Sequence, residues 1–86
     1  MIIKKELMKR QIAGETFLVP LGKMVHDTNG LFFLTEVGTF IWDLLPQAEN
    51  EEQILDAVLA EYEVDPETAR ADIAAFVGKL RTMDIL

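Results

Sequence analysis

The sequence predicts an α+β fold in which a three-stranded antiparallel sheet is followed by three helices. Two observations support this order. Apolar residues in the N-terminal part lie in short strand-like runs, whereas those of the remaining chain recur every three or four residues, as on one face of a helix. The period changes inside residues 30–45, where the apolar run 31–34 leads directly into a helical pattern. At 86 residues, the chain is predicted to form one domain covering 1–86.

The N-terminal part predicts a β-hairpin. Residues 6–12 and 16–21 form two strand-like runs, and Gly14 with Glu15 is expected to supply the turn between them. The single histidine, His26, falls in the loop that follows, before a turn signal at 29–30. It has no second kind of metal ligand near it in the sequence, so we interpret it as a loop residue without chemistry.

The first helix is predicted over residues 36–45. The hydroxyl of Thr35 can cap its start, and Pro46 ends it because the residue before a proline disfavours helical geometry. Trp42 lies off the main apolar stripe, and we expect it to fill the boundary between this helix and the sheet.

Two further helices are predicted over residues 51–62 and 66–83. Asn50, followed by Gln53, resembles a capping box at the start of the second helix. Asp65 is a natural N-cap for the third, and the proline after it suits the first helical position. With the short turn between them, these two helices have the form of a helix-turn-helix, and the sheet would act as its wing.

The composition excludes several kinds of site. The chain has no cysteine, no serine and one histidine, and it contains no glycine-rich nucleotide-binding loop. The carboxylates fall on the predicted solvent faces of helices, whereas acid–base catalysis requires buried groups with shifted pKa values beside a pocket. We therefore predict no catalytic residues, no metal site and no cofactor, and a protein that is not an enzyme.

The net charge of −7 is unevenly distributed. Residues 1–35 carry five basic side chains against three acidic ones, whereas residues 36–86 carry three against twelve. The acidic helical part weighs against a nucleic-acid partner, since phosphate binding requires clustered Lys and Arg. No apolar run approaches the roughly 18 residues of a membrane span. We expect a cytoplasmic protein without a membrane partner.

The third helix carries a second stripe beside its core stripe. The core stripe consists of Ala69, Ile73, Phe76 and Leu80, and the second stripe of Arg70, Ala74, Val77 and Arg81. Small apolar residues bracketed by two arginines could form a groove wall, with the arginines holding carboxylates of a bound peptide. The alternative is an ordinary boundary stripe whose arginines make intrahelical pairs, such as Glu67 with Arg70.

The third strand is the other half of this candidate site. It consists of Leu31, Phe32, Phe33 and Leu34. If it lies at an edge of the sheet, its free N–H and C=O groups can pair with a strand from another chain. An edge strand beside the stripe with the arginines would form a peptide groove.

The chain resembles the PqqD-like family over nearly its whole length, and three segments carry the resemblance. They are the strand-to-helix segment 30–45, with its Ile-Trp-Asp-Leu-Leu run, and the segments 61–67 and 72–80. The sequence departs from the family at Thr35, where the family usually has Asn. Both residues can cap a helix, so the expected start of the helix is the same.

The resemblance implies a winged helix-turn-helix module of the kind called a RiPP recognition element, a peptide chaperone. Such a module binds the leader of a ribosomally made precursor peptide, which adds as a strand to the third strand and packs against the third helix. A partner enzyme, often a radical SAM enzyme, then modifies the precursor. In this chain the leader would pair with residues 31–34. The helix residues proposed for contact come from the stripe pattern, because the resemblance supplies only the element.

Two other functions fit the same order of elements. The first is a winged-helix DNA-binding regulator, although its recognition helix would begin at Asp65 with an acidic end that repels phosphate. The second is a structural adaptor that associates with itself through the exposed edge of residues 31–34. The sequence leaves open whether the protein is a monomer or a homodimer.

Overall fold

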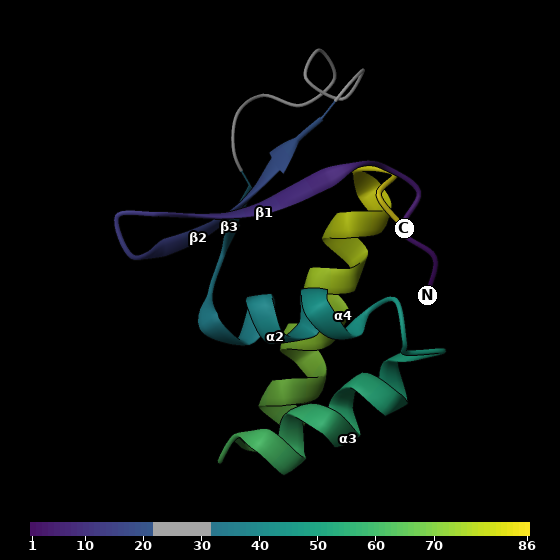
Figure 1. Ribbon diagram of the computed structural model, residues 1–86. Helices are drawn as coiled ribbons and strands as arrows, with labels where there is room; N and C mark the ends of the chain where they lie inside the picture. Colours follow the sequence, from purple (N-terminus) through teal and green to yellow (C-terminus); the bar gives the residue numbers. More distant parts are fainter. Residues whose placement is uncertain (22–31) are drawn as a thin grey trace.

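A computed structural model describes residues 1–21 and 32–86 and has the predicted order of elements (Figure 1). The strands are β1 (Leu7–Ile12), β2 (Glu15–Pro20) and β3 (Phe32–Leu34), and the helices are α2 (Glu36–Leu44), α3 (Glu51–Glu61) and α4 (Pro66–Thr82). The predicted α+β fold, an antiparallel sheet followed by three helices, is confirmed. The predictions for His26, for the turn at residues 29–30 and for Leu31 lie outside the described residues.

The hairpin turn lies one residue earlier than predicted. Ala13 and Gly14 both have positive φ, at 54° and 81°, whereas Glu15 already pairs with Ile12 as the first residue of β2. A two-residue hairpin turn of this type requires positive φ at both of its positions. The prediction failed because Ala is a rare residue in that conformation, so only Gly14 was visible as a turn former.

The predicted helix starts are confirmed. Thr35, Asn50 and Asp65 each accept a hydrogen bond from the backbone N–H three residues further on, at 3.0, 3.0 and 3.1 Å. Each of these bonds satisfies an N–H that has no partner within the helix. The three helices end one residue before their predicted ends.

The core lies between the sheet and the helices, which gather on one side of the sheet in Figure 1. Leu18 from the central strand is completely buried, and Trp42 on α2 is only 8% exposed. Helix α4 crosses behind α2 and packs most extensively against α3 (Figure 1). The fifteen buried hydrophobic residues form one cluster that includes residues from all three helices, so the described parts fold around a single core.

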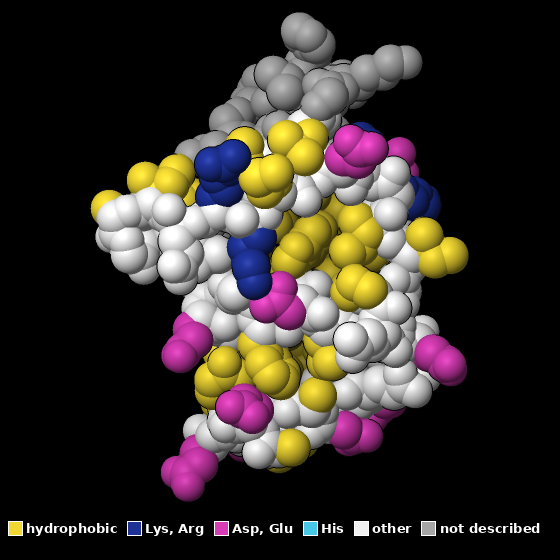
Figure 2. Space-filling model, viewed as in Figure 1, with side chains coloured by type: hydrophobic (Ala, Val, Ile, Leu, Met, Phe, Trp, Pro, Cys, Tyr) yellow, Lys and Arg dark blue, Asp and Glu magenta, His cyan; other side chains and the backbone are white. Residues whose placement is uncertain are grey.

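The charge is separated along the molecule. On the face in Figure 2, the Lys and Arg side chains gather over the sheet, and most acidic side chains lie over the helices. Lys9 on β1 bridges the two parts, because its ammonium lies 2.7 Å from the Asp43 carboxylate on α2. None of the helices in residues 1–21 and 32–86 is long and apolar enough to cross a membrane.

Candidate functional site

Strand β3 is an edge strand of the described sheet, whose order is β1-β2-β3. Its register pairs Phe33 with Phe17. The Leu21 N–H donates to the Glu6 carbonyl at 3.1 Å, and hydrogen-bonded pairs alternate along an antiparallel ladder, so Phe17 bonds to β1. The N–H and C=O of Phe33 therefore point away from β2, toward the outer edge.

The side chains of β3 alternate between the two faces of the sheet. Phe32 and Leu34 face the helices and are 9% and 2% exposed, whereas Phe33 is 51% exposed on the outer face. The ring of Phe33 packs edge-on against that of Phe17, with 5.6 Å between their centroids. Strand β3 thus contributes two side chains to the core and keeps one backbone donor and one acceptor at the edge.

Two residues of α4 lie beside this edge. The ring of Phe76 packs edge-on against Phe32 at 6.2 Å, and the ammonium of Lys79 lies 4.7 Å from the centre of the Phe32 ring. That ammonium position is within the range of a cation–π contact. Phe76 is half-buried and Lys79 is exposed. We call the group formed by Phe32, Phe33, Leu34, Phe76 and Lys79 the edge surface.

A glycine brings α2 close to the edge surface. A Cβ atom placed on Gly38 would lie 3.7 Å from a Leu34 methyl group and 3.9 Å from the Phe76 ring. It would also lie 3.1 Å from the hydroxyl of Thr35, which caps the same helix. The absence of a side chain at Gly38 therefore lets the end of β3, the start of α2 and the middle of α4 meet at one point.

In the predicted stripe of Arg70, Ala74, Val77 and Arg81, both arginines face α3. Arg70 pairs with Glu52, and a guanidinium nitrogen of Arg81 lies 4.0 Å from a carboxylate oxygen of Glu51. The pairs are interhelical, so the expected intrahelical pair of Arg70 with Glu67 is not the one formed.

The individual residues of this stripe do not form an open groove wall. Val77 is 1% exposed and belongs to the core, whereas Ala74 is exposed to solvent. The hydrogen bond and charge of Glu52 raise the pKa of Arg70. Both arginine side chains are more than half exposed, so their ion pairs add little to stability.

Phe76 and Lys79, which contact Phe32 of β3, lie on the opposite boundary of α4. Together with Asp72 and Met83 they have the same i, i+4, i+7, i+11 spacing as the predicted stripe. Sequence reasoning assigned Phe76 to the core stripe and passed over Lys79. The available signal was the presence of Lys79, since the acidic part of the chain has three basic residues and the predicted stripe contains only the other two.

A small apolar pocket lies at the junction of α2 with the ends of α3 and α4. It has a volume of about 60 Å³, and its lining includes Val37, Val64, Ala69, Asp72 and Ile73. Its lining surface is almost entirely apolar. Asp72 lies one helical turn before Phe76 along α4, so the pocket adjoins the end of the edge surface at which Leu34 lies.

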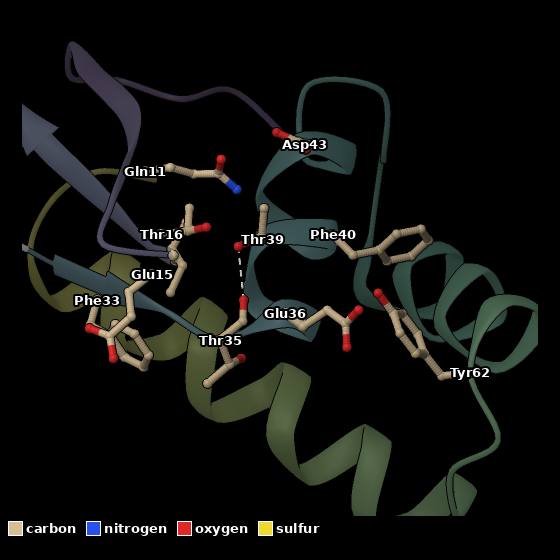
Figure 3. A pocket seen from close by; sticks show the side chains of 12 residues that line it. Gln11, Glu15, Thr16, Phe33, Thr35, Glu36, Thr39, Phe40, Asp43 and Tyr62 are labelled. Carbon is tan, nitrogen blue, oxygen red and sulfur yellow. Dashed lines mark hydrogen bonds between the residues drawn. The ribbon is translucent and has the colours of Figure 1, made fainter.

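A larger and more open hollow lies between the hairpin and α2 (Figure 3). Its volume is about 540 Å³, and acidic, threonine and aromatic side chains line it. The Glu36 carboxylate and the Tyr62 hydroxyl point toward one another (Figure 3). Partial burial and the charges of Glu36 and Glu61 raise the pKa of Tyr62, so its phenol stays protonated at neutral pH and keeps an O–H donor beside the Glu36 carboxylate. Within residues 1–21 and 32–86, no three His, Cys, Asp or Glu side chains are grouped to hold a metal ion.

Comparison with known proteins relates this arrangement to a defined family. The family model for coenzyme PQQ synthesis protein D (PqqD) matches residues 15–86. The fold is similar to a solved structure described as TbiB1 in complex with the TbiA(beta) leader peptide, with a TM-score of 0.73 and 34% sequence identity. That match covers 100% of this chain and 94% of the other. No curated protein matches the sequence. The chain belongs to the PqqD family.

Proposed function

We propose that this protein binds the leader segment of a ribosomally made precursor peptide by strand addition to β3 and presents it to a modifying enzyme. The observation that carries this proposal is the outward-facing N–H and C=O of Phe33, since these groups are what an added strand requires. The similarity to TbiB1 supports it, because that protein was solved in complex with a leader peptide.

The edge surface supplies the proposed contacts. The leader pairs with the backbone of Phe32–Leu34, and Leu31 adjoins this segment outside the described residues. On the helix side we propose Phe76 and Lys79 in place of the predicted stripe, because they contact Phe32 whereas the two arginines of the stripe pair with α3. An antiparallel leader strand fits best, since the sheet it joins is antiparallel.

The role is one of presentation. The chain holds the leader and performs no chemistry, and a separate enzyme modifies the remainder of the precursor. The family resemblance favours a radical SAM enzyme as that partner. Because precursor and enzyme meet where the ribosome releases the peptide, we place the complex in the cytoplasm.

The test uses peptides of about twelve residues, long enough to span β3 and extend beyond it. A random library of such peptides is selected on the immobilised full chain, and the enriched peptides are titrated into ¹⁵N-labelled protein. Amide shifts are expected at residues 32–34 and 76–79. Shifts confined to the β1–β2 hairpin or to α3 would contradict strand addition at β3.

Charge reversal at Lys79 should weaken the binding of peptides that carry a carboxylate. Lys79 lies over Phe32 at the edge, where an acidic peptide side chain can pair with its exposed ammonium. An exposed ion pair contributes up to about 1 kcal/mol, so Lys79→Glu should weaken binding about fivefold or slightly more, as measured by calorimetry.

Arg81→Glu is the matched control, because it makes the same charge change within the same last turn of α4 but on the flank facing α3. Its affinity should stay close to that of the wild type. If both variants lost the same amount of peptide affinity, the cause would be the net charge of the protein, and Lys79 would have no specific role.

A further inference from the structure

We infer that the small apolar pocket at the junction of α2 and α4 receives an aliphatic side chain of the bound peptide, two residues before the one opposite Leu34. This inference rests on the proposed strand addition and names a feature of the peptide that the pocket would recognise. Four features support it: the shape of the pocket, its continuity with the edge surface, the direction of the added strand and the spacing along it.

The pocket is suited to an aliphatic group. Its volume of about 60 Å³ is small, and its lining is almost entirely apolar, which suits the branched end of Val or Leu. Val37, Ala69 and Ile73 give it apolar walls, while Asp72 at its lining disfavours an acidic side chain. Val64 is 39% exposed, so part of its apolar surface stays open to a partner.

The direction of the added strand leads the peptide to this pocket. Phe32 contacts Phe76 and Lys79, whereas Leu34 lies near Gly38 at the start of α2, so β3 runs against the direction of α4. A peptide antiparallel to β3 therefore runs in the same direction as α4. Its residues before the one opposite Leu34 extend toward the N-terminal half of α4, where Asp72 borders the pocket.

The spacing selects one peptide position. From Phe76 back to Asp72 is four helical residues, or about 6 Å along the axis. An extended chain covers this distance in about two residues. The residue directly opposite Leu34 faces the helices as Leu34 does, and the residue two places before it faces the same way. We call this position the pocket position; the residue between the two faces outward.

The experiment uses the peptides enriched on the full chain. At the pocket position these peptides should carry Val, Ile or Leu. Replacing that residue by Ala removes about two buried methylene equivalents and should weaken binding about tenfold. The same replacement at the intervening outward position is the matched control and should change the affinity less than about twofold.

A protein variant tests the same contact from the other side. Val64→Asp places a carboxylate at the pocket in a loop residue that is already partly exposed, so the fold should survive. This variant should bind the selected peptides about tenfold more weakly. It should also bind peptides with Ala or Val at the pocket position with equal affinity. The control is Ile2→Asp, the same kind of change at another exposed aliphatic residue, which is 83% exposed.

The outcomes separate this inference from the function on which it rests. If the amides of residues 32–34 shift but both the pocket-position replacement and Val64→Asp leave the affinity unchanged, the pocket inference is wrong and strand addition stands. If selected peptides lack an aliphatic residue at the pocket position, the inference is also wrong. If no enriched peptide shifts residues 32–34, strand addition itself fails.

Discussion

Phe33→Pro is expected to abolish peptide binding while the domain stays folded. Proline has no N–H and places its ring carbon where that N–H pointed, so it removes a donor and blocks a strand from approaching the edge. The N–H of Phe33 points away from β2, so no hydrogen bond of the sheet itself is lost. We expect a loss of affinity of at least about tenfold by calorimetry, with the circular dichroism spectrum retained.

Phe33→Ala is the control, since it removes the same aromatic ring but keeps the backbone N–H. It should bind peptide nearly as well as the wild type. If the proline variant also binds normally, strand addition at β3 is wrong. The same pair of variants tests the adaptor hypothesis, because any self-association through this edge, measured as molar mass in solution, should disappear only with proline.

Val77→Asp is expected to unfold the domain or to lower its free energy of unfolding by about 3–5 kcal/mol. Val77 is 1% exposed in the core, and no basic side chain is buried in the described parts of the chain to pair with a new carboxylate. Urea denaturation followed by tryptophan fluorescence measures this change, with the buried Trp42 as the probe.

Ala74→Asp makes the same kind of change on the same predicted stripe, but at an exposed position. It should alter the free energy of unfolding by no more than about 0.5 kcal/mol. A folded Val77→Asp protein with near-normal stability would show that Val77 lies on an open surface, as the sequence pattern predicted. The pair therefore tests directly which part of the stripe is core.

The fold was predictable because its signals are local. Thr35, Asn50 and Asp65 each cap a helix through a hydrogen bond to an N–H three residues away, and such a bond depends on neighbouring residues alone. The hairpin was also predictable from the sequence. Its turn was misplaced by one residue because Ala13 has a positive φ, which is rare for alanine.

The candidate site was predictable only in part. Strand β3 was identified, together with the possibility of an open edge. An amphipathic helix has two boundaries, one on each side of its buried face. The arginines of the predicted stripe lie on the boundary of α4 that faces α3, whereas Phe76 and Lys79 contact β3 from the other boundary. Which boundary meets β3 depends on contacts between distant parts of the chain, such as Lys79 with Phe32. The local pattern of α4 does not show which of these two basic residues, Lys79 or Arg81, lies beside β3.

The separation of charge between sheet and helices has a kinetic consequence. A molecule with a basic end and an acidic end turns in the electric field of a charged partner, so encounters occur preferentially in one orientation. Mobile ions weaken this steering over a distance of about 10 Å at 0.1 M salt. Added salt should therefore slow the association of a charged enzyme or precursor while changing dissociation far less, because short-range packing governs how long the complex lasts.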